Sequence, residues 1–244
     1  MSRHRGKPQN VVVFDLDETL GYFQEIAVFH DIMSRHMRAS TETRQRLLHH
    51  LFDLCPEYFR PNIMEVLTYL KEKKQTGECS MVMIYTNNQG ALNWTDMITS
   101  YLHKKINYPL FDHVVKAFKI NGEIVEVCRR THEKTTKDLL RCAKLPSNSQ
   151  ICFIDDNQFK YMNDVYYIKV HPYVHNLSFH VVTSRLFSSN LFRRTRIREE
   201  LFIPFFNRHV GEYKTNYEMK PDDEYEIDII ITKRLQELLS DFFE

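Results

Sequence analysis

The strongest constraint on the fold is a short apolar run near the start of the chain that stops at acidic residues. Residues 11–14 are Val-Val-Val-Phe, and Asp-Leu-Asp-Glu-Thr-Leu (15–20) follows directly. A continuous β-branched and aromatic run is typical of a strand that is buried on both faces of a parallel sheet. The two carboxylates, Asp15 and Asp17, lie two positions apart and face the same way if the chain is extended. We therefore predict a buried strand with paired carboxylates at its carboxyl end.

Two later apolar runs also end in polar or acidic residues. Residues 80–85 are followed by Thr-Asn-Asn, and residues 151–154 by Asp-Asp-Asn. Helical patterns separate these runs, and residues 166–170 resemble a further strand. Because the carboxyl ends of parallel strands meet at one edge of the sheet, we expect these polar groups to lie together there. The predicted fold class is α/β, with a Rossmann-like, doubly wound parallel sheet.

Two additions to this sheet are predicted. Apolar residues at helical spacing indicate a small helical insertion after the first strand, at about 22–58. The dipeptide Asn-Gly at 121–122 lies between the apolar runs 114–120 and 124–127. It adopts the positive φ values of a tight type I′ turn, so a β-hairpin is expected there. Pro61 suits the first turn of the helix that leads to the second strand.

Charge and composition exclude several classes of protein. The chain of 244 residues carries 33 Lys and Arg against 32 Asp and Glu, and a formal charge of +1 argues against nucleic acid or an anionic membrane as a partner. Its apolar runs are far shorter than the ~18 residues of a membrane-spanning helix. The basic N-terminus is not followed by the long apolar segment of a secretory signal. We therefore expect a protein of the cytoplasm or nucleus that is neither secreted nor membrane-bound.

The cysteines and histidines give no sign of a structural metal. The five cysteines are odd in number and scattered, without a Cys-x-x-Cys pair. We expect reduced, mostly buried thiols rather than a disulfide framework or a zinc site. Among the twelve histidines, no nearby carboxylate or cysteine pattern completes a zinc shell.

The paired carboxylates predict a site for a metal ion and a phosphate ester. Two like charges this close need a cation, and Mg²⁺ prefers hard oxygen ligands of this kind. A loop carrying Lys134 and Lys137 precedes the strand at 151–154 and supplies a cation that can meet a phosphate. The structural alternative is that the acidic residues before Leu20 cap a helix. Thr86 has a comparable alternative as a cap of the strand end.

In this order, the motif residues resemble the haloacid dehalogenase-like (HAD) phosphotransferase superfamily: Asp-x-Asp-x-Thr at 15–19, then Thr86, then a lysine, then Asp-Asp at 155–156. The flanking sequences Phe-Arg-Pro at 59–61 and Lys-Asp-Leu at 137–139 resemble its FCP/SCP (NIF-like) branch of carboxy-terminal-domain phosphatases. The resemblance covers about residues 11–173. The chain departs from the branch in the Asn-Asn after Thr86, in the helical insertion and in its C-terminal extension. Such embellished versions also occur in large DNA viruses, so a viral source, with location in a host cell, is a further expectation.

The resemblance implies roles for the matching residues. Asp15 is then the nucleophile, which becomes an aspartyl phosphate. Asp17 is the general acid that protonates the leaving group and the general base that activates water. Thr86 is expected to bind a phosphoryl oxygen, with Asn87 as a further candidate beside it.

The same resemblance implies the lysine and the metal ligands. Lys137 is preferred over Lys134 as the phosphate-binding residue because it matches the Lys-Asp-Leu context of the branch. The implied magnesium ligands are the Asp15 carboxylate, the Asp17 backbone carbonyl and Asp156. Asp155 is expected to support the lysine or a metal-bound water.

The expected function is hydrolysis of a phosphomonoester, with magnesium as cofactor and phosphoserine or phosphothreonine in a protein segment as substrate. One alternative uses the helical insertion as a lid over a small phosphorylated metabolite or nucleotide. Another is a non-catalytic, partner-binding protein on the same fold, against which the presence of every charged motif residue argues. The expected domains are a flexible basic arm (1–9), a HAD-like phosphatase domain (10–175) that contains the insertion, and a C-terminal extension (176–244) that packs on the domain or binds a partner.

Overall fold

The computed structural model describes residues 9–193, 197–213 and 222–244. Of the predicted basic arm (1–9), all but Gln9 lies outside these residues. Within them, every helix is too short or too polar to cross a lipid bilayer.

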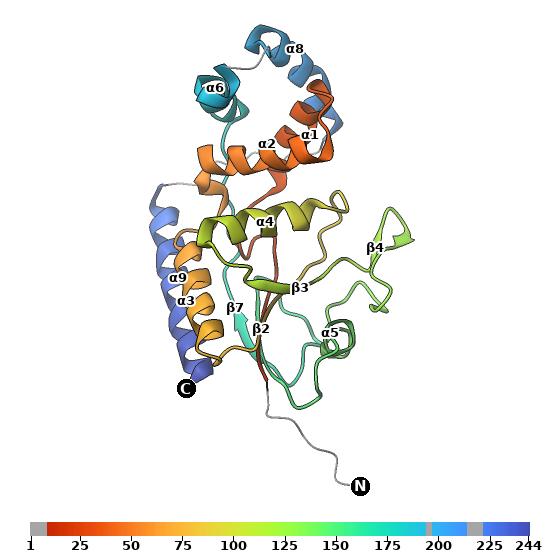
Figure 1. The fold of residues 1–244 in the computed structure, drawn as a ribbon, viewed down its shortest axis with the longest axis vertical. Coiled ribbons are helices and arrows are strands. Elements are labelled where there is room, and N and C mark those ends of the chain that lie inside the picture. Colours follow the sequence, from red (N-terminus) through yellow and green to blue (C-terminus); the bar gives the residue numbers. More distant parts are fainter. Residues whose placement is uncertain (1–8, 194–196, 214–221) are drawn as a thin grey trace. The chain divides into compact units, whose positions relative to one another are not determined.

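A parallel sheet forms the centre of one of the two compact units of the chain (Figure 1). In the described residues it has five strands in the order β3-β2-β1-β6-β7, each parallel to its neighbours. The strands are β1 (Asn10–Phe14), β2 (Met81–Tyr85), β3 (Phe111–Val115), β6 (Gln150–Asp155) and β7 (Tyr166–Lys169). Helices lie on the connections from β1 to β2, from β2 to β3 and from β3 to β6, and the chain winds first to one side of β1 and then to the other. This topology confirms the predicted α/β, doubly wound parallel sheet.

The central strand β1 is buried on both faces, as its sequence predicts. Residues 11–14 are each 0% exposed. Val13 is in register with Met83 on β2 and with Phe153 on β6, and all three belong to an apolar cluster that includes Leu139 of helix α5 (Thr136–Ala143). Since neighbouring residues of a strand point to opposite faces, a strand covered on both sides must be apolar at every position.

Four helices pack with this sheet. They are α3 (Ile63–Gln75), α4 (Trp94–Ile106), α5 (Thr136–Ala143) and α9 (Asp222–Phe243). Figure 1 shows α3 and α9 side by side, with α5 on the other side of the sheet, and the rings of Tyr69 and Phe243 join α3 to α9 with centroids 6.3 Å apart. The placement of Pro61 in the first helical turn is wrong, because α3 begins at Ile63. Asn62 before it has a φ of 59°, a left-handed conformation that asparagine tolerates and that turns the chain into the helix.

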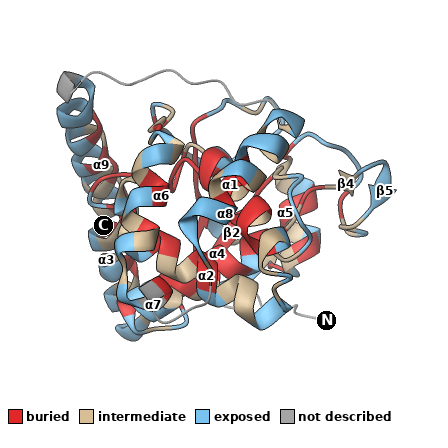
Figure 2. Cartoon of the chain, turned by 90° about the horizontal axis from the view of Figure 1, so that it is seen from above, coloured by how far each residue is buried: buried red, intermediate tan, exposed pale blue. Residues whose placement is uncertain are grey.

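The apolar run at 114–120 does not form one hairpin strand. Its first residues, Val114 and Val115, belong to β3 and pair with β2 in the main sheet. The hairpin is shorter than expected and consists of β4 (Lys119–Ile120) and β5 (Glu123–Ile124), which are exposed or half-buried (Figure 2). The predicted turn is confirmed, since Asn121 and Gly122 have φ values of 51° and 86°. Val114 and Val115 pair with β2 and do not join the hairpin, and the local sequence pattern does not reveal which strand they will pair with.

The described residues divide into two compact units. The first contains the sheet and comprises residues up to Leu20, Arg60–Tyr173 and Glu226–Glu244; the second comprises Gly21–Phe59 and Val174–Tyr225. The helical insertion forms α1 (Gln24–His36), α2 (Thr41–Leu54) and the short helix η1 (Pro56–Tyr58). Its partners in the second unit are α6 (Phe179–Ser188), α7 (Asn190–Arg193), α8 (Glu199–His209) and η2 (Val210–Glu212). The segment predicted as one extension (176–244) is thus divided between the two units.

The two ends of the helical insertion meet in a backbone contact that requires glycine. Gly21 forms a bridge with Phe59, and the Tyr22 N–H donates to the Tyr58 carbonyl over 2.8 Å. A Cβ on Gly21 would lie 2.4 Å from the Tyr58 carbonyl oxygen, so no larger residue fits. Farther along the insertion, the ring of Phe29 packs against Phe202 of α8, with centroids 5.6 Å apart. Aromatic packing therefore joins two segments that are far apart in the sequence.

A buried glutamate in the second unit predicts a pH-dependent stability. Glu25 on α1 is 1% exposed; its Oε2 accepts from the Leu177 N–H over 3.0 Å, and its Oε1 has no hydrogen-bond partner among the described residues. Burial raises the pKa of Glu25 from 4.5 to about 7. Because the folded state binds this proton more tightly than the unfolded state, protonation of Glu25 adds to the free energy of unfolding. This stabilisation is fully present below the pKa of Glu25 in the unfolded state and is lost as the pH rises through its pKa in the folded state.

We expect Glu25→Gln to increase the free energy of unfolding at pH 8 by about 1–3 kcal/mol and to change it little at pH 4.5. Urea denaturation at both pH values measures this difference. Glu42→Gln on the exposed start of α2 is the matched control and should leave the pH dependence unchanged. Identical pH dependence in the wild type and Glu25→Gln would contradict the prediction.

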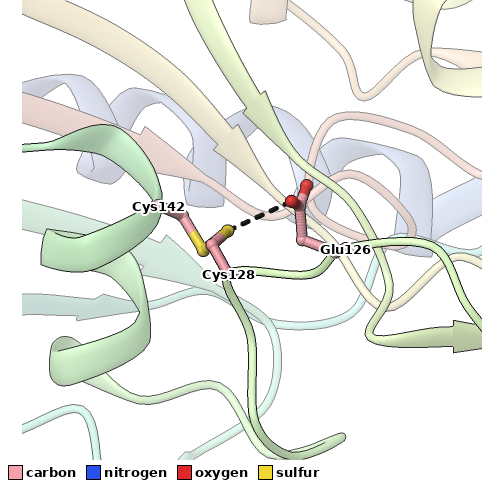
Figure 3. Close-up of side chains that lie close together, drawn as sticks. All are labelled: Glu126, Cys128 and Cys142. Atoms are coloured by element: carbon pink, nitrogen blue, oxygen red, sulfur yellow. Dashed lines mark hydrogen bonds between the residues drawn. A yellow bond between two sulfur atoms is a disulfide. The ribbon is translucent and has the colours of Figure 1, made fainter.

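One disulfide corrects the expectation of reduced thiols. Cys128, in the loop after the hairpin, is bonded to Cys142 near the end of α5 (Figure 3). The other three cysteines, Cys55, Cys79 and Cys152, are free and buried, as expected. Glu126 Oε1 lies 3.1 Å from Cys128 Sγ, so this corner gathers potential metal ligands. Sulfur atoms joined in a disulfide are not thiolates, however, and do not bind a metal as such.

Candidate active site

The motif residues meet at the carboxyl ends of β1 and β6, which are neighbours in the sheet. The chain leaves β1 toward β2 on one side and has β6 on the other, so this edge is a switch point of the topology, where ligands bind in open α/β sheets. The Asp15 N–H donates to the Ile154 carbonyl over 2.8 Å and continues the pairing of the two strands. Asp15 itself is 7% exposed. The acidic residues that end two separate sequence runs therefore lie side by side.

A buried arginine holds the loop that follows Asp15. Arg60 is 1% exposed, and its guanidinium donates over 2.7 Å to each of three backbone carbonyls, those of Glu18, Thr19 and His171. Glu18 has a φ of 60°, a conformation that a non-glycine residue rarely adopts without such support. The Phe-Arg-Pro sequence at 59–61 marks the position of Arg60 but does not reveal this role.

Asp17 lies beside Asp15 but has a different environment. Its carboxylate is half-buried and accepts a hydrogen bond from Asn88 Nδ2 over 2.8 Å. Burial, together with the charge of Asp15, raises the pKa of Asp17 to about 7. A carboxyl group with this pKa exchanges a proton near neutral pH, as a general acid and base must.

Lys134 is the cation among the carboxylates. Its Nζ forms an ion pair with Asp15 and another with Asp155 over 2.7 Å, and its side chain is 2% exposed. Burial acts against the charge of Lys134, but the two carboxylates outweigh it and raise its pKa. The Nζ also lies over three aromatic rings, at 5.8, 5.7 and 5.1 Å from the centroids of Tyr85, Phe153 and Phe159. Lys134 is therefore held in a fixed, charged state at the site.

The structure places Lys134, and not the preferred Lys137, beside the carboxylates. Thr135 bridges to Tyr161 and caps α5, with its Oγ1 accepting from the Asp138 N–H over 3.0 Å. Lys134 therefore precedes the helix and reaches the strand ends, whereas Lys137 lies in the first helical turn and is exposed. The Lys-Asp-Leu context identified the helix start but not the side chain that faces the carboxylates.

Thr86 and the asparagines after it take three different positions. Thr86 directly follows β2, is 1% exposed, and accepts a hydrogen bond from the Asn88 N–H at its Oγ1 over 2.9 Å. Asn87 points elsewhere: its Oδ1 accepts from Arg129 Nη2 over 2.8 Å. Arg129 is buried and also donates to the Thr86 carbonyl over 3.0 Å, so it connects the end of β2 to the loop that leads to Lys134. The sequence indicates Asn87 as a candidate but does not indicate Arg129 or the contact of Asn88 with Asp17.

Three carboxylates form a cluster with the composition of a magnesium site. Oxygen atoms of Asp15, Asp155 and Asp156 all lie within 4.8 Å of one another. Asp156 is oriented by Thr19, whose Oγ1 donates to its Oδ1 over 3.1 Å, and by the Asn157 side chain. Burial and the charge of Asp15 raise the pKa of Asp156, and burial raises that of Asp155 despite Lys134. Excess negative charge of this kind, with oxygen donors alone, fits a hard divalent cation. The expected backbone ligand at Asp17 is not part of this carboxylate cluster and stays a prediction.

Neither protein-family models nor curated proteins match this chain. Among solved structures, it matches CbbY from Rhodobacter sphaeroides in complex with phosphate, with a TM-score of 0.33 and 12% sequence identity. The match covers 61% of this chain and 78% of that chain. A TM-score of this size carries no conclusion about the activity of this chain. The expected FCP/SCP branch and viral source have no support among these comparisons.

Proposed function

We propose that this protein is a magnesium-dependent phosphomonoester hydrolase of HAD type that forms an aspartyl phosphate on Asp15. The observation that carries the proposal is the meeting of Asp15, Lys134 and Asp156 at the carboxyl ends of two neighbouring strands. A buried carboxylate beside a fixed ammonium group and further acidic ligands suits attack on a phosphate ester, whose negative charge requires cations on several sides. A helix cap, the structural alternative, does not call for a lysine buried against two aspartates.

Each proposed step has a residue in a suitable place. Asp15 attacks phosphorus in line, the bond from phosphorus to the ester oxygen breaks, and protonated Asp17 gives its proton to that oxygen. Asp17, now a carboxylate, takes a proton from the water that hydrolyses the aspartyl phosphate, which restores both side chains. Lys134 and the Thr86 hydroxyl bind phosphoryl oxygens. Magnesium, held by Asp15, Asp156 and the Asp17 carbonyl, would supply electrostatic stabilisation of the phosphoryl charge.

The proposed substrate is a phosphoserine or phosphothreonine in a protein segment. Support for this finer step comes from the resemblance of residues 59–61 to the FCP/SCP branch. In this chain Arg60, the middle residue of that sequence, holds the loop that follows Asp15. The competing substrates are small phosphorylated metabolites and nucleotides, which a substrate panel separates from phosphopeptides.

We expect hydrolysis of an aryl phosphate that stops when EDTA removes divalent cations and returns when Mg²⁺ is added. In the same buffer, kcat/KM should be higher for phosphoserine peptides than for nucleoside monophosphates or sugar phosphates. Release of inorganic phosphate measures both. Turnover that persists in EDTA would contradict the magnesium requirement. A preference for small phosphates would contradict the proposed protein substrate and favour a metabolite or nucleotide. If no member of the panel were hydrolysed, the hypothesis of a non-catalytic, partner-binding protein would be favoured instead.

A further inference from the structure

Asn88 makes hydrogen bonds that hold its side chain in one orientation. Its Nδ2 donates to Asp17 Oδ2 over 2.8 Å, and its Oδ1 accepts from the Gly90 N–H over 2.8 Å. If the amide were flipped, its oxygen would face a carboxylate and its NH₂ group would face a backbone donor, and both contacts would be lost. The surroundings therefore define which end of the amide meets Asp17.

The backbone of the same turn reinforces this arrangement. The Asn88 N–H donates to Thr86 Oγ1 over 2.9 Å, which ties the start of the turn to the end of β2. At the other end of the turn, a Cβ on Gly90 would lie 2.9 Å from Asn88 Oδ1, closer than such atoms approach. A larger residue at position 90 would displace the Asn88 amide, while the next nearest atoms, on Trp94, lie at an ordinary 3.6 Å. The turn is shaped to present one amide donor to Asp17.

We propose that Asn88 is a positioning residue that aims the Asp17 carboxyl group at the leaving-group oxygen, and that it thereby allows the enzyme to act on esters with poor leaving groups. This inference rests on the proposed function and adds a specificity role to it. The donated hydrogen bond engages Oδ2 and leaves Oδ1 of Asp17 to carry the proton. Alkyl phosphates such as phosphoserine depend on protonation of the leaving oxygen, whereas an aryl oxide of low basicity departs without it.

The test compares leaving groups rather than activity alone. We expect Asn88→Ala to lower kcat/KM for a phosphoserine peptide by ~10–10²-fold and that for p-nitrophenyl phosphate by less than ~3-fold. Across a series of aryl and alkyl phosphates, the plot of log kcat/KM against leaving-group basicity should become steeper. Because kcat/KM reports the steps up to formation of the aspartyl phosphate, later hydrolysis of that intermediate does not mask the effect.

Gly90→Ala provides a second route to the same displacement without changing Asn88 or Asp17. It should steepen the same plot to a lesser degree, and the exposed neighbour Gln89→Ala should not change it. Thermal melting checks that each variant is folded. An equal loss for every substrate, or no loss, in Asn88→Ala would overturn the inference while the proposed function stands. A wild type that hydrolyses none of the substrates would overturn the proposed function, and this inference with it.

Discussion

Asp15→Asn is expected to lower phosphatase turnover by ~10⁴-fold or more, the order of loss when a catalytic nucleophile is removed. The amide has the size of the carboxylate and still offers an oxygen to Lys134, but it does not attack phosphorus at a useful rate. Lys134 keeps its ion pair with Asp155, so we expect the fold to persist. Hydrolysis of an aryl phosphate measures the loss, and intact mass spectrometry after rapid acid quenching tests for a phosphorylated enzyme in the wild type alone.

Asp241→Asn, on an exposed position of α9, is the matched control and should retain wild-type turnover. Thermal melting of both variants separates loss of chemistry from loss of fold. Hydrolysis that survives Asp15→Asn at more than about a tenth of the wild-type rate would rule out covalent catalysis by this residue.

Lys134→Met should lower kcat by ~10²–10³-fold, because it removes the cation that we propose binds the phosphoryl oxygens. The change also leaves Asp15 and Asp155 without their partner in a buried site, so the free energy of unfolding should fall as well. Added Mg²⁺ should restore part of this stability, since a divalent cation offsets the same carboxylates. The measurements are steady-state hydrolysis and thermal melting with and without Mg²⁺.

Lys137→Met is the matched control three positions along the chain. Lys137 is exposed, so its loss should change kcat and the melting temperature little, within about twofold for kcat. A large catalytic loss in Lys137→Met together with a small one in Lys134→Met would favour Lys137, as the resemblance of residues 137–139 does, and would contradict the proposed role of Lys134.

The sheet and its polar edge could be predicted because their signals are local. The apolar run before Asp15 is buried at every position, and the runs before Thr86 and Asp155 form its two neighbours β2 and β6. Strand burial leaves a continuous apolar pattern, and parallel order places the following residues at one edge. The predicted turn at Asn121 and Gly122 is equally local, since it depends on the φ values that these residues tolerate.

The rest depends on contacts between distant segments. The pairing of Lys134 with Asp15 joins positions 119 apart, and the contact of Asn88 with Asp17 joins positions 71 apart. The Cys128–Cys142 disulfide forms because α5 places one sulfur beside the hairpin loop. A periodic pattern specifies which face of an element is buried but not which element will cover it.

The sequence alone predicted the α/β class, the edge of the sheet at which the candidate site lies, and the two aspartates that begin it. It did so because strand burial and strand order act through neighbouring residues. The folded structure was needed to show which lysine faces those aspartates, that Arg60 supports their loop, and that Asn88 donates a hydrogen bond to Asp17. Two side chains three positions apart, such as Lys134 and Lys137, differ in the direction they point once a helix begins between them, and that direction has meaning only relative to the folded sheet.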